Sequence, residues 1–164
     1  MSATPMPDEP LLRVSRLSKR FPRATGEVLV LDAIDMEVRS GESVGILGRS
    51  GSGKSTLLRS IAGLVPPSGG SVFFEGKPVD GPAAGIALVF QGFALFPWLT
   101  VLGNVALGLR ALGVDEDEAR RRSLAAIDLI GLDGFESAYP RELSGGMQQR
   151  VGFARALVVD PTLL

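Results

Sequence analysis

The sequence of 164 residues contains neither cysteine nor histidine, and each absence excludes a kind of chemistry. Without cysteine there is no disulfide framework and no thiolate metal site. Without histidine the chain lacks the commonest general base, and with it any Ser–His or Cys–His nucleophile pair. Any catalysis by these residues must therefore rest on other groups.

The chain also lacks an excess of charge and an apolar run long enough to cross a membrane. Its 17 Lys and Arg residues nearly balance 18 Asp and Glu residues, so no nucleic-acid partner is expected. Residues 81–109 carry no charge, but glycines, a proline and polar amides interrupt them before an apolar segment of about 18 residues can form. Residues 1–10 are acidic and proline-rich, unlike a signal peptide, and are expected to form a disordered leader.

A glycine-rich loop at residues 48–56 is the strongest feature that is present. It follows the apolar run 43–47 and precedes a helical pattern, an order typical of a phosphate-binding loop. In such a loop the backbone N–H groups and the positive end of the helix converge on phosphate oxygens. The alternative is an ordinary surface loop, which the match in spacing disfavours. The predicted ligand is a nucleoside triphosphate, bound by Gly48, Arg49, Ser50, Gly51, Ser52, Gly53, Lys54, Ser55 and Thr56.

Apolar patterning predicts the elements around this loop. Residues 11–39 alternate in polarity and predict a sheet with one solvent-facing side, and residues 71–79 predict a short hairpin. The near-continuous apolar runs 43–47 and 86–90 predict strands buried on both faces of a parallel sheet.

Helix signals are concentrated in the second half of the chain. Thr100 is predicted to cap one helix, and Asp115 opens another as part of a capping box. In that second helix three acidic residues stand four positions before arginines, which predicts i, i+4 ion pairs, and Gly131 is expected to end it. The pairs are Glu116/Arg120, Asp117/Arg121 and Glu118/Arg122, and the predicted buried stripe is Ala119, Ala126, Ile127 and Ile130.

A second candidate anion site begins another helix. Ser144 is the expected N-cap, and Gly145 and Gly146 in the first turn expose bare N–H groups. The core face of this helix is predicted to hold Met147, Val151, Ala154 and Val158. The alternative interpretation is an ordinary capped helix with glycine in its first turn.

Taken together, these motifs resemble the nucleotide-binding subunit of an ABC transporter. Residues 48–56 match the Walker A loop, residues 143–150 match the family signature, and Gln91 matches the Q-loop glutamine. The match covers residues 11–164. It implies an α/β fold, with a P-loop NTPase core, an N-terminal antiparallel β subdomain and a helical insert that carries the signature motif. The implied divisions are 11–42 and 71–80 for the β subdomain, 43–63 and 86–91 for the P-loop core, and 92–150 for the Q-loop and helical subdomain.

The resemblance also implies cofactors and residue roles. ATP and Mg²⁺ are the expected cofactors, with Lys54 and Gln91 as catalytic residues and Ser55 and Gln91 as metal ligands. Phe21 stands where an aromatic side chain stacks on adenine in the family, although a core phenylalanine is the alternative. The resemblance implies a second ATP-binding subunit, expected to be an identical copy. The ATP bound by that subunit would be contacted by four residues of this chain: Ser144, Gly145, Gly146 and Gln148.

Further partners follow from the segment after Gln91. In the family this segment receives a short helix from a transmembrane permease subunit, so Phe93, Leu95, Phe96 and Trp98 form an expected docking patch. Core packing under a loop is the alternative. Residues 96–101 resemble importers of nitrate, sulfonate and taurine, which implies an indirect partnership with a periplasmic or extracellular solute-binding protein. The implied location is peripheral, at the cytoplasmic face of the cell membrane.

The family continues after Asp160 and Pro161 with an apolar strand that ends in Asp-Glu, and these 164 residues stop two residues into that strand. The Walker B aspartate, the catalytic glutamate and the switch histidine are therefore absent from the sequence. The chain is expected to be a fragment, incomplete at its C-terminus, that alone hydrolyses ATP poorly even though the family are ATP hydrolases.

The sequence leaves two alternative functions. One is a nucleotide-binding fragment or interaction module that does not hydrolyse ATP. The other is a chromosome-maintenance ATPase of the SMC type, which inserts a long coiled coil between the two motifs. Only 51 residues lie between Gln91 and Leu143, so the spacing disfavours the SMC type.

Overall fold

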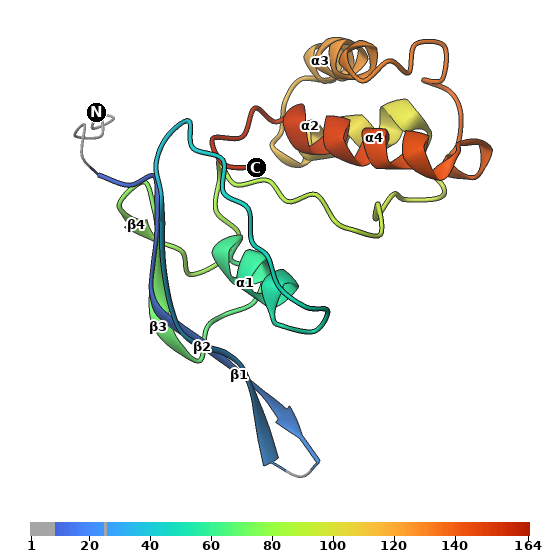
Figure 1. Cartoon of the computed structure of the whole chain (residues 1–164). Helices are drawn as coiled ribbons and strands as arrows, with labels where there is room; N and C mark the ends of the chain where they lie inside the picture. The colour runs from blue at the N-terminus through green and yellow to red at the C-terminus, as the bar shows by residue number, and fades with distance from the viewer. Residues whose placement is uncertain (1–8, 25) are drawn as a thin grey trace. The chain divides into compact units, whose positions relative to one another are not determined.

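The computed structural model describes residues 9–24 and 26–164. These residues form two compact units, the first ending at Ala83 and the second beginning at Ala84. The ribbon of both units is drawn in Figure 1. Most of the leader predicted for residues 1–10 lies outside the described residues.

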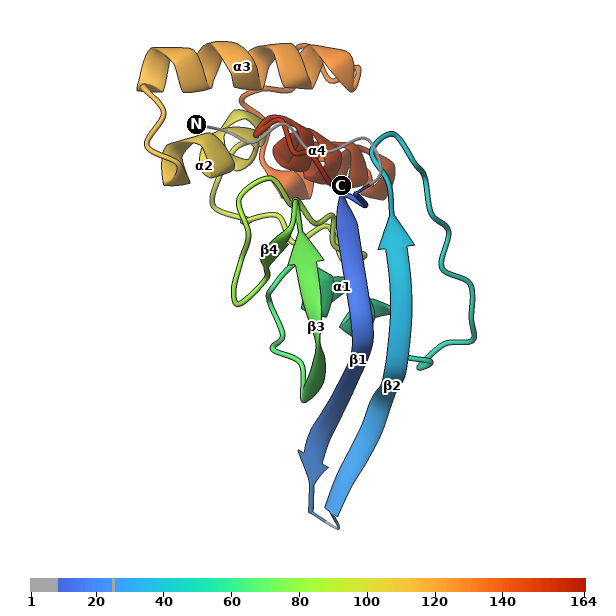
Figure 2. The ribbon, with the colours of Figure 1, turned by 90° about the vertical axis from the view of Figure 1, so that its left-hand side faces the viewer.

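The first unit is built on a four-stranded antiparallel sheet with strand order β2-β1-β3-β4, which Figure 2 shows face on. Strands β1 (Leu12–Arg23) and β2 (Gly26–Val38) form a long hairpin. Strands β3 (Gly69–Phe74) and β4 (Lys77–Pro78) form the short hairpin that the sequence predicts. The predicted alternation is also confirmed, because one side of the sheet is buried. Its core residues include Leu12, Val14, Leu17, Leu31, Val38, Val72 and Phe74.

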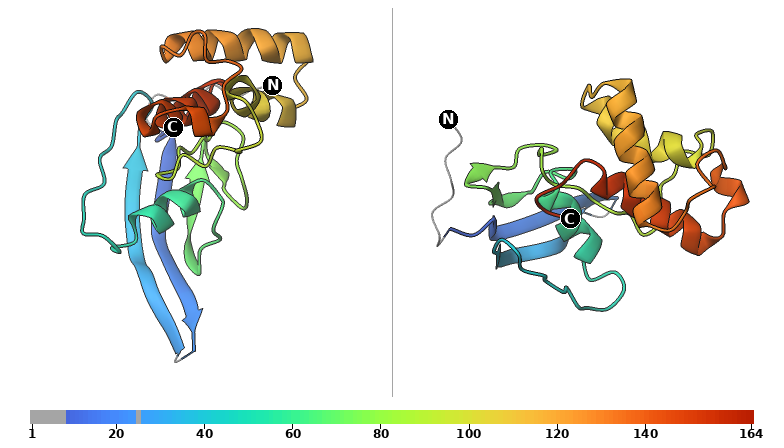
Figure 3. Two further views of the ribbon diagram at one scale, coloured as in Figure 1. Left: turned by 90° about the vertical axis from the view of Figure 1, so that its right-hand side faces the viewer. Right: turned by 90° about the horizontal axis from the view of Figure 1, so that it is seen from above.

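Helix α1 (Lys54–Ile61) follows the glycine loop, as predicted, and contacts β2 (Figure 3). Leu57 and Ile61 are its buried apolar residues. Gly63 ends the helix in the left-handed conformation, with φ 71°. A Cβ at this position would lie 1.9 Å from the carbonyl oxygen of Gly81, so the close approach of a second backbone segment requires glycine here.

The prediction of a buried strand at residues 43–47 is wrong for this structure. The segment has no regular secondary structure, and the side chains of Val44 and Leu47 are 46% and 96% exposed. A strand of a parallel sheet needs at least one neighbouring strand, and no strand pairs with this segment in the described part of the chain. The apolar side chains of residues 43–47 therefore have no neighbouring strand among the described residues to pack beside.

The second unit consists mainly of three helices that pack on one another: α2 (Val101–Ala111), α3 (Glu116–Leu129) and α4 (Gly145–Leu157). A short 3₁₀ helix, η1 (Pro140–Glu142), leads into α4. None of the helices in the described residues is long and apolar enough to cross a bilayer. The predicted core positions are confirmed except for Ile130 and Met147, which are only partly buried. The core includes Val101, Val105, Leu109, Ala119, Ala126, Ile127, Leu132, Leu143, Val151, Ala154 and Val158.

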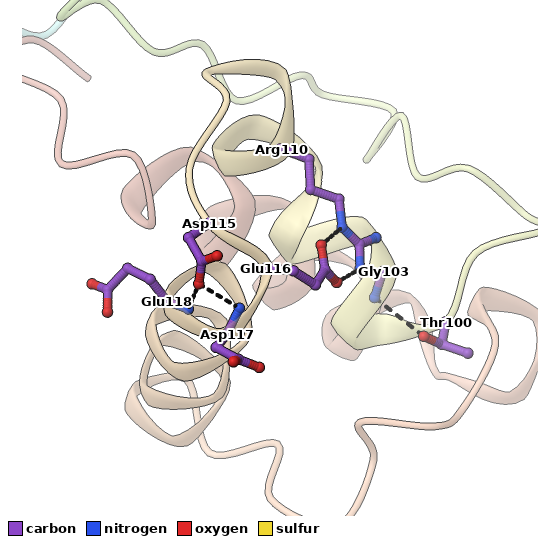
Figure 4. Close-up of polar contacts among 7 residues, drawn as sticks. All are labelled: Thr100, Gly103, Arg110, Asp115, Glu116, Asp117 and Glu118. Atoms are coloured by element: carbon purple, nitrogen blue, oxygen red, sulfur yellow. Dashed lines mark hydrogen bonds and ion pairs between the residues drawn. The ribbon is translucent and has the colours of Figure 1, made fainter.

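The predicted helix caps are present (Figure 4). The Thr100 hydroxyl accepts a hydrogen bond from the Gly103 N–H at 3.1 Å. A carboxylate oxygen of Asp115 accepts from the N–H groups of Asp117 and Glu118 at 3.0 and 3.3 Å. The returning bond that would complete the capping box at Asp115 is missing, since the Glu118 carboxylate accepts from Arg121 instead. Gly131 follows the end of α3 with φ 65°, as predicted.

The predicted i, i+4 ion pairs of α3 are not formed. Glu116 pairs with Arg110 of α2, and Glu118 pairs with Arg121, three positions along. Arg122 donates to the carbonyl oxygen of Val158 at 2.7 Å. An i, i+4 pair contributes only a few tenths of a kcal/mol, so partners from other elements readily displace it.

Residues 86–90 also differ from the buried strand that was predicted. One parallel bridge joins Ile86 to Leu163, and the Ala87 N–H donates to the Leu163 carbonyl oxygen at 2.9 Å. No further strand pairing of residues 88–90 occurs within the described residues. The direction of the bridge is the predicted one, but the strand itself is not established.

Candidate functional site

The glycine loop wraps around the amino group of Lys54, the first residue of α1. The Lys54 Nζ donates to the carbonyl oxygens of Gly48 and Arg49 at 2.7 and 2.8 Å, and lies 3.5 Å from the Ser52 hydroxyl. The Ser52 N–H donates to the Arg49 carbonyl oxygen at 3.2 Å and tightens the turn. The lysine charge is therefore held over the loop that precedes the helix.

The N–H groups at this helix start are free to bind an anion. Among the described residues, those of Gly53, Lys54, Ser55 and Thr56 have no acceptor, whereas the Leu57 N–H already donates to the Gly53 carbonyl oxygen. Free N–H groups and the positive end of the helix dipole favour a bound phosphate or carboxylate. With the Lys54 ammonium, they form a site suited to a polyphosphate.

Two glycines give the loop its shape. Gly51 and Gly53 have φ values of 78° and 93°, which favour glycine over any residue with a Cβ. A Cβ on Gly53 would also lie 2.8 Å from the carbonyl oxygen of Val30 in β2. The loop conformation thus depends on the sheet below it as well as on its own sequence.

Ser55 is the residue of this loop that the sequence predicts as a metal ligand. It is exposed in the first turn of α1, and its hydroxyl has no hydrogen-bond partner among the described residues. No cluster of three or more His, Cys, Asp or Glu side chains suited to a metal ion occurs in that part of the chain. Mg²⁺ fits this site if phosphate oxygens complete its shell, since it prefers oxygen ligands and retains water.

Gln91, the other predicted metal ligand and catalytic residue, lies in an exposed turn of the second unit. Its proposed role stays a prediction.

Phe21 lies near the free end of the β1–β2 hairpin and is 37% exposed. The Lys19 ammonium lies 5.1 Å from the centre of its ring. The alternative prediction of a core phenylalanine is therefore wrong. Stacking of Phe21 on adenine stays a prediction that its exposure permits.

The second predicted anion site begins α4. The Ser144 hydroxyl accepts from the Met147 N–H at 3.3 Å, and Gly145 and Gly146 follow it, exposed, in the first turn. Gln148 donates its side-chain amide to the carbonyl oxygens of Pro140 and Leu143 at 2.9 and 3.3 Å. Gln148 thereby fixes the turn before the helix, a role that the sequence does not predict.

The residues of the predicted docking patch differ in exposure. Leu95 packs against the core of the three helices, which matches the alternative of core packing. Phe96 and Trp98 are 37% and 68% exposed, and their ring centres lie 5.2 Å apart. Phe93 is half-buried.

An open apolar groove of about 450 Å³ lies beside this patch, between the Phe96 segment and the helices. Its walls include Leu88, Phe90, Phe96, Leu107, Gly108, Ala156 and Val159.

Two residues that the sequence analysis missed bind the backbone of this segment. Asn104 of α2 is fully buried and contacts Phe96 and Leu99, and Arg155 of α4 contacts Phe93 and Ala94. Burial lowers the pKa of Arg155. A polar amide between apolar neighbours in α2 was the signal available for Asn104. No local signal marks Arg155, whose partners are 61 and 62 residues away.

Comparison with known proteins places these features in context. The family described as ABC transporter matches residues 31–164. The chain is 47% identical over 153 residues to an uncharacterized ABC transporter ATP-binding protein of Methanocaldococcus jannaschii. It is 46% identical to a nitrate import ATP-binding protein of Synechocystis and 47% identical to a taurine import ATP-binding protein of Burkholderia pseudomallei, again over 153 residues. Each match covers 93% of this chain but only 57 to 59% of the relative.

Solved structures agree with the sequence matches. A dimeric ATP-binding cassette bound to ADP and phosphate, described as a post-hydrolysis state, superposes with a TM-score of 0.84 at 33% identity. That match covers 92% of this chain and 70% of the other. A cassette from the cbiONQ transporter of Clostridium perfringens superposes with a TM-score of 0.76 at 31% identity, covering 94% and 63% of the two chains. These neighbours confirm the predicted α/β P-loop NTPase fold.

Proposed function

The chain belongs to the ABC transporter family, and from this premise we propose that it is the ATP-binding, energy-coupling subunit of an importer. One observation carries the proposal. The Lys54 ammonium is held over a glycine loop, beside a helix start whose N–H groups have no acceptor among the described residues. This arrangement binds the β- and γ-phosphates of ATP through lysine and backbone N–H groups. Mg²⁺, when bound through Ser55 and the phosphates, offsets phosphate charge.

A second subunit explains why the chain has two anion-binding helix starts of different construction. The α1 end combines a lysine with glycines, whereas the α4 end has Ser144, Gly145 and Gly146 and no charged side chain in its first turn. We propose that each ATP lies between the Lys54 loop of one subunit and the Ser144 end of α4 in the other. Two copies of one chain satisfy this arrangement by two-fold symmetry. Hydrolysis is proposed for the full-length protein, with Gln91 as a proposed catalytic residue and metal ligand.

Import is the proposed direction of transport, and nitrate, sulfonate, taurine or a similar small solute is the proposed cargo. The similarity to nitrate and taurine import proteins supports this assignment. The exposed rings of Phe96 and Trp98 and the adjacent apolar groove support a permease docking surface. The protein would then lie at the cytoplasmic face of the cell membrane, with a solute-binding protein on the other side as an indirect partner.

The direct test is equilibrium binding of MgATP to the full-length protein by calorimetry. Lys54→Met keeps the length of the side chain and removes its charge, so it is expected to weaken binding at least tenfold, a charged hydrogen bond contributing about 1.5–3 kcal/mol. Lys77→Met, on exposed β4, is the matched control and should bind as the wild type does. Equal affinity in all three proteins would overturn the proposal.

A further inference from the structure

Residues 93–99, here called the aromatic loop, have neither helical nor strand structure, yet the side chain of Asn104 holds their backbone. This side chain is fully buried at the start of α2. Its oxygen accepts from the Phe96 N–H at 2.8 Å, and its amide donates to the carbonyl oxygens of Phe96, Leu99 and Thr100 at 3.0 to 3.1 Å. The bonds require both an acceptor and a donor on one short side chain. Aspartate could accept but not donate, and leucine could do neither.

Arg155 of α4 holds the other end of the aromatic loop. Its two terminal nitrogens donate to the carbonyl oxygens of Ala94 and Phe93 at 2.7 and 3.1 Å. Phe93 and Ala94 are consecutive non-glycine residues in the left-handed conformation, with φ values of 55° and 48°. Such a pair persists only where surrounding contacts stabilise it. The guanidinium fork matches two successive carbonyl groups and supplies those contacts.

We propose that Asn104 and Arg155 are positioning residues that form the aromatic loop in its binding conformation before any partner arrives. Phe96 and Trp98 then present a fixed apolar surface, so binding of a partner avoids the entropy cost of ordering the loop. The proposed occupant is a short helix of a membrane subunit with an apolar face, and this part of the inference rests on the proposed function. The apolar groove beside the loop matches such a face in chemistry.

Hydrogen–deuterium exchange on the full-length protein tests the role of Asn104. Asn104→Ala is expected to speed exchange of the loop amides, that of Phe96 above all, by about tenfold, as expected when a buried hydrogen bond is lost. Asn104→Asp keeps the acceptor for the Phe96 N–H but loses the donors to the loop carbonyl oxygens, so it should speed exchange less. The matched control is Val105→Ala, which alters the adjacent buried position of α2 but touches no loop hydrogen bond. Loop exchange that stays at the wild-type rate, or that rises only together with the three helices as in Val105→Ala, would overturn the inference.

Substitutions of Arg155 test its role in holding the aromatic loop separately. Arg155→Met keeps the apolar stem and removes the donors, and should speed exchange at residues 93–95 while the amides of α4 stay protected. Arg155→Lys restores a single donor group and should give intermediate exchange. If Arg155→Lys exchanges at the wild-type rate, the fork geometry has no role, and if Arg155→Met also does so, the assignment of Arg155 fails.

Trp98 provides an independent readout because it is the only tryptophan of the sequence. The part of the fluorescence that disappears in Trp98→Phe reports on the aromatic loop, and the Asn104 variants should increase its quenching by acrylamide, whereas Val105→Ala should not. Neither readout needs a partner.

Copurification with permease subunits tests the proposed function separately. Loss of the complex with intact loop protection would count against that function and not against the positioning role.

Discussion

The Lys54 ammonium lies 2.7 Å from the carbonyl oxygen of Gly48, six positions earlier in the chain. The Lys54 side chain thus closes the glycine loop, and the backbone of the loop sets the rest of its geometry. The loop backbone positions both the Lys54 amino group and the free N–H groups of α1. A change in the conformation of this backbone should therefore alter phosphate binding even where no binding side chain is lost.

Gly53→Ala should destabilise the first unit and abolish MgATP binding. It forces a left-handed φ of 93° on alanine and puts a Cβ 2.8 Å from the Val30 carbonyl oxygen. The expected loss is about 1–3 kcal/mol in the free energy of unfolding, measured by urea denaturation. Gly51→Ala is the control, because its φ is also positive but its Cβ meets open space. A loss at Gly51 as large as that at Gly53 would contradict the contact with β2.

Gly146→Asp should separate stability from function. Gly146 is exposed in the first turn of α4 and has open space where a Cβ would lie. An aspartate there replaces a poor helix former and favours the helix dipole, so the free energy of unfolding should rise by about 0.5–1 kcal/mol. The same carboxylate should repel a phosphate and abolish ATP-dependent dimerisation, measured by analytical ultracentrifugation. Intact dimerisation would show that this helix start contacts no phosphate.

The ion pair between Glu116 of α3 and Arg110 of α2 predicts a pH dependence of stability (Figure 4). The hydrogen bond from Arg110 lowers the pKa of Glu116 below its ordinary value of 4.5. A carboxyl group with a lowered pKa stabilises the fold above its ordinary pKa, and this contribution disappears as the pH falls through the lowered value. Melting temperatures of wild type and Glu116→Gln should therefore differ slightly at pH 7 and converge below pH 4.5. A difference that persists at low pH would rule out the ion pair as its source.

Ser123 is fully buried in α3, and its hydroxyl has no partner among the described residues. Ser123→Ala removes an unsatisfied polar group and should leave stability unchanged or raise it by up to about 1 kcal/mol. Ala126→Ser makes the reverse change in the same helix and should destabilise. Chemical denaturation of both variants gives the comparison, and a clear loss of stability in Ser123→Ala would mean that the hydroxyl has a bound partner.

The features that the sequence predicted correctly are mostly local. Ser144 and Thr100 cap their helices through bonds to N–H groups three residues ahead, and Gly131 follows the end of α3. These signals depend only on short-range geometry, so the sequence carries them in full. The glycine loop is local in the same sense, and its lysine contacts span six residues or fewer.

The features that were missed depend on distant partners. Residues 43–47 have the composition of a buried strand, but a strand requires neighbours, and none pairs with them in the described part of the chain. The arginines of α3 have long side chains that reach several carboxylates or carbonyl oxygens, so helical spacing alone did not select their partners. Asn104 and Arg155 act on a loop whose course is defined only by the folded second unit.

Mixing two inactive variants of the full-length protein tests the central claim most directly, that ATP lies between the Lys54 loop of one chain and the Ser144 end of α4 in another. Lys54→Met and Gly146→Asp should each be inactive in ATP hydrolysis alone. In an equal mixture, each dimer of one chain of each variant contains one intact site of two, so activity should return, to about a quarter of the wild-type level if the chains pair at random. A mixture of Lys54→Met with the double variant has no intact site and should stay inactive. Activity in the first mixture no higher than in the separate variants would contradict a site shared between two chains.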